Sequence, residues 1–353
     1  MLWYWGRRGG GAHYTAGLVE ALSAYPSIEL VSCVSSKLEC LDRVRKASPI
    51  LRTFHAHDAK QVPSAIRRLR AVAVDERVDV VLHSMVNPLT PIGLVVLPHE
   101  LPVVTVIHDA KPHPGDRHAL MDFAGRFAAR RSTRIIAASD HVAYQLVAHT
   151  QAAPIDVVRL GPHLDLPDMW DPDGPVVFLG RLRSYKGLDL LAESWAAVPS
   201  APGRVLRIMG EGDPGDPALD RLRALGADVR VGWIPDNEME SAIRGARLVV
   251  LPYREATQSG VVTLAAAARI PVLATDVGAL RSQVGDGGVV VEPTVAAFAE
   301  SLTSLFDNAE RLRSHHDMLV TRPSAAQEWK DIAGQISESL RRAIARGTST
   351  GGR

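Results

Sequence analysis

The chain has 353 residues, of which 46% are hydrophobic and 22% are charged. This composition is close to the globular average, which excludes wholesale disorder, and the length suits two domains better than one. Lysine plus arginine (40) nearly balances aspartate plus glutamate (39), for a net charge of +1. We therefore expect no nucleic-acid partner.

The two cysteines, Cys33 and Cys40, fit neither a disulfide framework nor a zinc site. The first residues lack the charged and apolar regions of a signal peptide. The apolar runs fall far short of the ~20 residues that a membrane-spanning helix needs. From these features we expect a cytoplasmic protein in a reducing compartment.

Short β-rich runs alternate with helix-like segments along the first half, which is typical of a parallel, doubly wound sheet. Most runs are continuously apolar, as strands covered on both faces should be. A helix is expected after the first strand, from Gly11 to Tyr25. The predicted strands are Leu2–Gly6, Ile28–Ser35, Val78–His83, Val103–His108, Arg134–Ser139 and Ile155–Leu160.

Residues 164–175 interrupt this alternation with three prolines and four aspartates, a composition that excludes helix and central strand. We place a linker there, between a first domain (1–163) and a second (176–322). A helix over 323–346 and a disordered tail over 347–353 are expected to follow. The second domain's predicted strands are Val176–Gly180, Val205–Met209, Val229–Trp233, Leu248–Pro252, Val272–Thr275 and Val289–Val291.

The sequence thus predicts an α/β protein of two Rossmann-like, doubly wound domains that face a central cleft. Open α/β sheets bind ligands at the carboxyl ends of their strands, so the loops that follow the strands are the candidate site.

Two loops of the first domain could carry chemistry. The first strand leads into Gly9-Gly10-Gly11, and consecutive glycines before a helix let backbone amides approach an anion. Tyr14 occupies the position of the third glycine of a dinucleotide fingerprint, so the loop does not match a dinucleotide-binding site. A flexible turn is the alternative. The fourth strand ends at His108-Asp109, where the aspartate can orient the imidazole; a structural histidine is equally compatible.

The second domain's first strand leads into Gly180-Arg181-Leu182 and then Lys186-Gly187. An arginine and a lysine at this spacing can close on a diphosphate from two sides. We expect Lys186 in the first turn of a helix, where a cation opposes the helix dipole unless an anion is present. This position favours a functional role.

Two other motifs match known patterns less well. Gly210-Glu211-Gly212 opens a literal GxGxxG, but Pro214 and Pro217 interrupt the helix start that a nicotinamide site requires. Asp171-Pro172-Asp173 matches the Asp-x-Asp of metal-dependent sugar transfer, but it lies in the linker, where a solvated turn is expected. No metal site is predicted.

Ser259-Gly260-Val261 lies between a strand and an alanine-rich helix, where small polar residues and glycine make an anion-binding N-terminus. Glu255 could bind sugar hydroxyls. The alternative is an ordinary helix capped by the Ser259 side chain.

Taken in order, these segments resemble the retaining glycosyltransferases of family 4, which share the two-domain GT-B fold. The likeness covers nearly the whole chain and is strongest from Val176 to Gly278. The motifs that carry it are Gly180-Arg181-Leu182, Lys186-Gly187, Gly210-Glu211-Gly212, Val231-Gly232-Trp233-Ile234-Pro235, Leu251-Pro252-Tyr253 and Ile270–Gly278, with the glycine loop and His108-Asp109 in the first domain.

The resemblance implies roles for these residues. Arg181 and Lys186 should bind the donor diphosphate and stabilise the departing nucleotide, and His108 should contact the donor sugar. Trp233-Ile234 should lie along the nucleobase, and the final helix should cross back onto the first domain. The implied donor-binding set is Gly10, Gly11, Gly180, Gly210, Glu211, Trp233, Ile234, Glu255, Ser259, Gly260 and Val261.

One departure from the family concerns two glutamates eight residues apart, whose positions are Ala256 and Leu264 here. The variant Ala-Thr-Gln-Ser-Gly-Val is similar to one in polysaccharide-assembly members. It leaves open whether Glu255 replaces them, and with that the donor sugar and base.

The expected function is metal-independent, retaining transfer of a hexose from a nucleotide diphosphate sugar, with no other cofactor, to a glycan or lipid-linked glycan. A GT-B nucleotide-sugar epimerase and a catalytically silent nucleotide-sugar-binding protein remain alternatives. Basic residues of the first domain suggest peripheral contact with the inner face of the cell membrane; a solvated helix face is the other reading. These are Arg43, Arg45, Lys46, Arg52, Arg67, Arg68 and Arg70.

Overall fold

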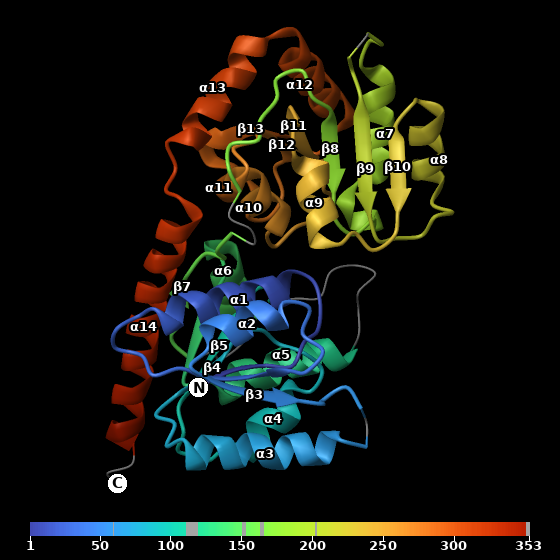
Figure 1. Cartoon of the computed structure of the whole chain (residues 1–353). Coiled ribbons are helices and arrows are strands. Elements are labelled where there is room, and N and C mark those ends of the chain that lie inside the picture. Colours follow the sequence, from blue (N-terminus) through green and yellow to red (C-terminus); the bar gives the residue numbers. More distant parts are fainter. Residues whose placement is uncertain (59, 111–118, 150–152, 163–165, 202, 351–353) are drawn as a thin grey trace. The chain divides into compact units, whose positions relative to one another are not determined.

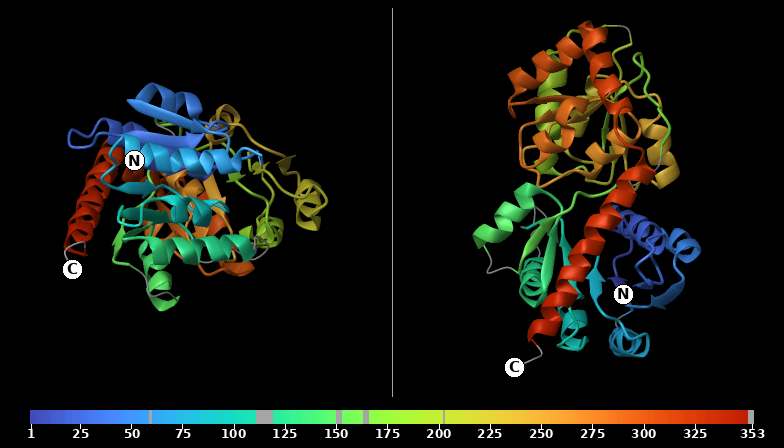
Figure 2. Two further views of the ribbon diagram at one scale, coloured as in Figure 1. Left: turned by 90° about the horizontal axis from the view of Figure 1, so that it is seen from below. Right: turned by 90° about the vertical axis from the view of Figure 1, so that its left-hand side faces the viewer.

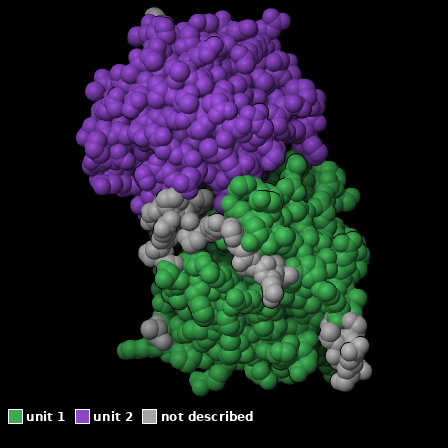
Figure 3. Space-filling model, turned by 180° about the vertical axis from the view of Figure 1, so that it is seen from behind, with its two compact units in different colours: residues 1–112, 116–163, 326–353 green, residues 113–115, 164–325 purple. Residues whose placement is uncertain are grey.

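A computed structural model of the chain describes residues 1–58, 60–110, 119–149, 153–162, 166–201 and 203–350 (Figure 1). The described residues divide into two compact units, coloured separately in Figure 3. Unit 1 contains residues up to 162 together with 326–350, and unit 2 contains 166–325. Each unit is an α/β domain with its own parallel sheet, as predicted.

Among the described residues, unit 1 has a seven-stranded parallel sheet in the order β3-β2-β1-β4-β5-β6-β7. Its elements are β1 (Leu2–Tyr4), α1 (Gly10–Ser23), β2 (Val31–Ser35), α2 (Leu41–Ala47), β3 (Ile50–Phe54), α3 (Val62–Asp75), β4 (Val81–His83), α4 (Thr90–Val96), β5 (Val103–Ile107), α5 (Ala119–Arg131), β6 (Arg134–Ala137), α6 (Asp140–His149), β7 (Ile155–Val157) and α14 (Ala325–Thr350).

Helices cover both faces of this sheet because successive strand side chains point to opposite sides. Leu2 and Tyr4 pack into a core with α1, α2 and α14. Trp3 and Trp5 pack on the other side, with α3, α4 and α5. The aromatic first strand is therefore buried on both faces, which explains its continuous apolar sequence.

Helix α14 lies along unit 1 in the views of Figures 1 and 2. Its buried stripe belongs to the core of α1 and α2. Trp329 donates a hydrogen bond from Nε1 to the Pro162 carbonyl oxygen (3.0 Å). Its ring lies so close to Gly17 that a Cβ there would come within 2.2 Å of the indole. The predicted return of the last helix to the first domain is confirmed.

Unit 2 has, within its described residues, a six-stranded parallel sheet in the order β10-β9-β8-β11-β12-β13. Its elements are β8 (Val176–Leu179), η1 (Ser184–Lys186), α7 (Leu188–Ala197), β9 (Leu206–Gly210), α8 (Pro217–Ala224), β10 (Asp228–Val231), α9 (Asp236–Ile243), β11 (Leu248–Leu251), α10 (Gly260–Ala267), β12 (Val272–Thr275), α11 (Leu280–Val284), η2 (Gly285–Gly287), β13 (Gly288–Val291), α12 (Val295–Asp307) and α13 (Ala309–Val320).

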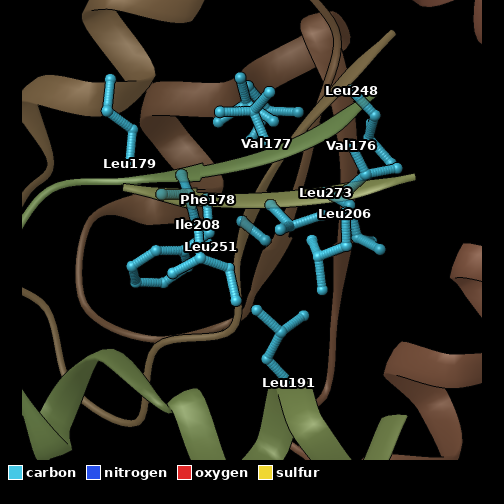
Figure 4. Packing of buried hydrophobic residues seen from close by; sticks show 14 of the residues in the cluster. Val176, Val177, Phe178, Leu179, Leu191, Leu206, Ile208, Leu248, Leu251 and Leu273 are labelled. Atoms are coloured by element: carbon cyan, nitrogen blue, oxygen red, sulfur yellow. The ribbon is translucent and has the colours of Figure 1, made fainter. Parts of the chain in front are cut away.

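The unit 2 core is formed by the central strands and the helices that cover them. Val176, Phe178 and Leu179 of β8 are almost fully buried, and Figure 4 shows them with Leu191 of α7 and Leu251 of β11. The strand order reverses between β8 and β11. In doubly wound sheets this switch point is where a ligand crevice opens, and it therefore locates the candidate site.

The structure differs from the predicted elements in three places. Strand β3 was missed because, at the sheet edge, it carries Arg52 and Thr53 and is only half-buried. The predicted linker is attached to unit 2: Trp170 donates from Nε1 to the Arg247 carbonyl oxygen (3.0 Å) and stacks on His316. Helix α14 continues to Thr350, into the predicted disordered tail.

Candidate functional site

The loop after β8 passes very close to the loop after β9. A Cβ added at Gly210 would lie 1.7 Å from the Gly180 carbonyl oxygen, so only glycine fits there. The Leu182 amide donates to the Glu211 carbonyl oxygen (2.8 Å), which ties the two loops together. The glycines of these motifs thus allow the two loop backbones to approach each other closely at the switch point.

Lys186 lies in a different local structure from the one predicted. It ends the short helix η1, Gly187 follows in the left-handed conformation with φ of 68°, and α7 begins only at Leu188. The Lys186 ammonium sits 3.6 Å from the centre of the Tyr253 ring and 5.2 Å from that of Tyr185. Two aromatic faces stabilise this cation. The prediction that Lys186 lies in the first turn of a helix is wrong, because α7 begins two residues later.

Arg181 shares the same aromatic support. Its Nη2 donates to the Tyr185 hydroxyl (3.2 Å), and the residue is exposed. Tyr185 is buried, and its carbonyl oxygen accepts from the Arg254 amide (2.8 Å). One tyrosine therefore connects both cations of the loop to the segment after β11.

The N-terminus of α10 is held by contacts that the sequence did not suggest. Ser259 occupies the N-cap position, but its side chain makes no capping bond. Its hydroxyl pairs instead with the Tyr253 hydroxyl (3.3 Å), and its amide donates to Gln283 Oε1 (2.8 Å). The alternative of an ordinary helix capped by the Ser259 side chain is therefore wrong.

Tyr253 is the centre of this arrangement. The side chain is fully buried, and burial raises the pKa of its hydroxyl well above the ordinary value, against a smaller opposing effect of the Ser259 hydrogen bond. The phenol is neutral at physiological pH, so its ring presents an uncharged π-face to Lys186. Sequence reasoning found Tyr253 only as part of a motif, because its partners lie far along the chain.

The loop before α10 also holds a polar group without a partner. Among the described residues, Gln258 Oε1 is buried and accepts no hydrogen bond. Buried acceptors are normally satisfied, so this oxygen is a candidate for binding a ligand hydroxyl. The neighbouring positions of the family's two glutamates, Ala256 and Leu264, are buried in the unit 2 core. Glu255 is exposed.

The other predicted unit 2 residues have different environments. Val261 lies beside Gly180, since a Cβ there would touch its Cγ2 at 3.6 Å. Ile234 is buried in the core, whereas the Trp233 side chain is 41% exposed and can stack on a ligand. The Gly232 amide donates to the Gly210 carbonyl oxygen (2.8 Å), which joins this loop to its neighbour.

The predicted residues of unit 1 lie after β1 and β5. Gly10 and Gly11 form the first turn of α1, and a Cβ at Gly11 would meet the Tyr4 hydroxyl at 2.5 Å. The Gly9 amide already donates to the Glu39 carboxylate (3.0 Å), so an internal acid occupies one amide of the loop.

His108 follows β5, and its Nε2 lies 3.1 Å from Asp109 Oδ2, as the sequence suggested. The imidazole and the carboxylate are partly exposed, with 32% and 23% of their side chains accessible. An oriented histidine at the end of a buried strand can donate to or accept from a ligand.

The described residues contain no group of three or more His, Cys, Asp and Glu side chains that could hold a metal ion. Asp171 and Asp173 form an exposed turn, in which the Asp173 amide donates to Asp171 Oδ1 (2.9 Å), as expected. Across the described residues, no helix is both long and apolar enough for a membrane span.

Three of the seven basic residues assigned to membrane contact have carboxylate partners. Arg43 pairs with Glu20 (2.7 Å) and Arg52 with Glu76 (2.7 Å). Arg45 pairs with Asp42 one helical turn away. These ion pairs reduce the positive potential by which unit 1 would be attracted to an anionic surface.

Comparison with known proteins assigns both halves of the chain. Residues 8–166 match the sequence profile of Glycosyltransferase Family 4, and residues 174–308 match that of Glycosyl transferases group 1. The D-inositol 3-phosphate glycosyltransferase of Nocardia farcinica is 32% identical over 188 residues, which cover 49% of this chain and 42% of that protein. The match thus spans less than half the length of this relative.

Two solved structures share the fold over nearly the whole chain. HepE of Anabaena, in complex with UDP and glucose, superposes with a TM-score of 0.70 at 15% identity and covers 97% of this chain and 99% of its own. Sucrose-phosphate synthase of Thermosynechococcus elongatus gives 0.69 at 17% identity, with 96% and 94% covered. The chain carries two glycosyltransferase domains and has the GT-B fold.

Proposed function

We propose that this protein is a retaining glycosyltransferase that moves a hexose from a nucleoside diphosphate sugar to a glycan or lipid-linked glycan. The observation that carries the proposal is the pair of cations at the switch point of unit 2. Lys186 rests on Tyr253, and Arg181 is held by Tyr185. Two cations whose positions are fixed by aromatic side chains are suited to a diphosphate.

In this proposal the two cations stabilise the leaving nucleotide. As the bond between the sugar and the diphosphate breaks, negative charge grows on the phosphate oxygens, and preorganised cations lower the barrier because they need no reorientation. The departing diphosphate accepts the proton of the attacking hydroxyl on the same face of the sugar, which retains the configuration. The protein supplies both positive charges, so no metal ion is required.

Other residues would position the donor. The amides of Gly260 and Val261 lie in the first turn of α10 and can face its phosphate or sugar, whereas the Ser259 amide donates to Gln283 Oε1 (2.8 Å). Gln258 Oε1 can accept from a sugar hydroxyl, a contact that the family makes with glutamate. Trp233 can lie along the base, and His108 can contact the sugar.

Relatives suggest the first substrates to test. HepE was solved with UDP and glucose, so UDP-glucose is the first donor, with GDP-hexoses as comparison. The name of the Nocardia relative makes inositol phosphate the first acceptor. Peripheral contact with the inner face of the cell membrane, where lipid-linked glycans are extended, is part of the proposal.

The test measures nucleotide release from these donors with and without acceptor, and determines the product anomer by NMR. Acceptor-dependent release of UDP with retained configuration is expected. Release that is independent of acceptor would favour an epimerase, and tight binding without turnover would favour a silent binding protein. Lys186→Ala and Arg181→Ala should each lower kcat by about 10²–10³. Arg183→Ala, an exposed arginine in the same loop, is the matched control and should change little.

A further inference from the structure

Three loops of unit 1 bring two cationic side chains and a histidine to one edge of its sheet. Strands β3, β2 and β1 are parallel neighbours, so the segments that follow them meet at their carboxyl ends. The segment after β1 carries Arg7, the one after β2 carries Lys37, and the one after β3 carries His57. All three residues are exposed.

Hydrogen bonds hold these loops against one another. The Ser36 amide donates to the Phe54 carbonyl oxygen (2.9 Å), and the Ser36 hydroxyl pairs with His55 Nδ1 (2.9 Å). The Glu39 amide donates to the Arg7 carbonyl oxygen (2.7 Å). These bonds fix the three loops against one another, so Arg7, Lys37 and His57 belong to one surface.

Arg7 and Lys37 act electrostatically on the His57 imidazole. Burial lowers the pKa of His57 below its ordinary value, and the positive charges of Arg7 and Lys37 lower it further. Like charges held together are unfavourable unless an anion lies between them, and a bound anion would relieve that repulsion.

The nearby acids have other partners. Glu39 Oε2 accepts from the Gly9 amide (3.0 Å), and Asp58 accepts from the Lys60 amide (3.0 Å) and from Gln61 Nε2 (3.2 Å). Across the described residues, no ion pair joins Arg7, Lys37 or His57 to a carboxylate.

Other arginines of unit 1 are neutralised instead. They form the close pairs Arg43–Glu20, Arg52–Glu76 and Arg134–Asp156. Among the described residues, Arg7 and Lys37 lack a carboxylate partner of this kind.

We propose that Arg7, Lys37 and His57 bind a phosphate group carried by the acceptor substrate. This inference rests on the proposed function, since it assigns the acceptor to this edge. The donor diphosphate already has its own cations, Arg181 and Lys186, in unit 2. A phosphorylated acceptor would be selected over a neutral one by charge and hydrogen bonding at this edge.

The first experiment is independent of catalysis. Histidine labelled with ¹³C at Cε1 is observed by NMR while inorganic phosphate, and separately glucose 6-phosphate, replaces chloride at constant pH and ionic strength. The His57 signal, assigned with His57→Gln, should move saturably with both. Arg7→Gln and Lys37→Gln should each weaken the phosphate affinity read at His57 by about tenfold, the range of a charge-assisted hydrogen bond.

Matched variants test whether the effect is local. Arg67→Gln and Lys46→Gln remove exposed cations of the same types elsewhere in unit 1 and should leave the His57 titration unchanged. Lys186→Ala should also leave it unchanged, although it removes a cation assigned to the donor. A His57 signal insensitive to phosphate, or one weakened equally by the matched variants, would overturn the site.

A second experiment separates this inference from the proposed function. Transfer from the donor is compared for inositol and inositol phosphate, and Arg7→Gln should raise KM for the phosphorylated acceptor alone. If transfer fails with every donor while His57 still responds to phosphate, the proposed function falls and the anion site stands. If transfer proceeds without preference for phosphate and with Arg7→Gln silent, the acceptor assignment is wrong.

Discussion

The contact between Lys186 and Tyr253 gives the sharpest test of how the donor site is built. The ammonium lies 3.6 Å from the ring centre, and the ring is fully buried. A cation–π interaction of this kind contributes ~1–2 kcal/mol, because the ring side of the ammonium is desolvated. Replacing the ring with an aliphatic side chain should release the ammonium from its position.

Two substitutions separate the ring from its hydroxyl. Tyr253→Leu removes the ring, and the loss of ~1–2 kcal/mol of positioning should lower kcat by about five- to thirtyfold, with a smaller change in KM for the donor. Tyr253→Phe keeps the ring and removes only the 3.3 Å contact with Ser259. It should therefore retain most of kcat.

The assay is steady-state nucleotide release, with thermal unfolding as the test of the fold. Phe298→Leu, which shortens another fully buried aromatic side chain of unit 2 on α12, controls for general destabilisation. A folded Tyr253→Leu enzyme with normal kcat would refute the positioning role. Equal losses in the Phe and Leu variants would show that the hydroxyl, and not the ring, matters.

Four further predictions concern stability, metals and membranes. Gly17→Ala should lower the unfolding temperature by the equivalent of about 1–3 kcal/mol, because its Cβ would meet Trp329. Gly334→Ala on α14 has space for the Cβ and should stabilise the protein by about 1 kcal/mol. Similar effects of the two substitutions on the unfolding temperature would contradict the packing argument. The hydrogen bond from Arg134 lowers the pKa of Asp156, so its contribution to stability is complete above ~4 and is lost as pH falls through the lowered pKa. In urea unfolding, Asp156→Asn should therefore be more destabilising at pH 7 than at acidic pH, and an equal effect at both would contradict the linkage. Transfer should survive EDTA, and loss of activity that Mg²⁺ or Mn²⁺ restores would reject the metal-free mechanism. In co-sedimentation with anionic liposomes, binding should weaken at high salt and in Arg67→Gln; equal recovery in the supernatant with anionic and neutral vesicles would remove membrane contact from the proposal.

The fold could be predicted from sequence because its signals are local. Continuous apolar runs such as Val176–Leu179 report burial on both faces, and the proline-rich break marked the change of domain. Strand β3 was missed for the same reason: at the sheet edge it carries Arg52 and Thr53, and no continuous apolar run remains to report it. Some strands were also predicted too long, because apolar residues such as Ile28, which precedes β2, lie in the adjoining turns.

The candidate site could be predicted only as a set of loops. Arg181, Lys186 and Ser259 were found because each follows a strand. What surrounds them depends on contacts distant in sequence, such as Lys186 with Tyr253 and Ser259 with Gln283. The Glu39 carboxylate at the glycine loop comes from a different strand connection and has no local signal.

These long-range contacts change how the missing family glutamates should be understood. Ala256 and Leu264 are not vacated polar positions, since both are packed into the core. The polar groups of this segment are other side chains: Gln258 has a buried oxygen without a hydrogen-bond partner, and Ser259 connects the start of α10 to Tyr253. Because the same Tyr253 ring supports Lys186, a donor hydroxyl bound at Gln258 and a phosphate bound at Lys186 would be positioned by one continuous set of contacts. Under the proposed function, the variant segment would bind the donor through this different set of side chains. A Gln258→Ala enzyme should then lose sugar discrimination before it loses nucleotide affinity.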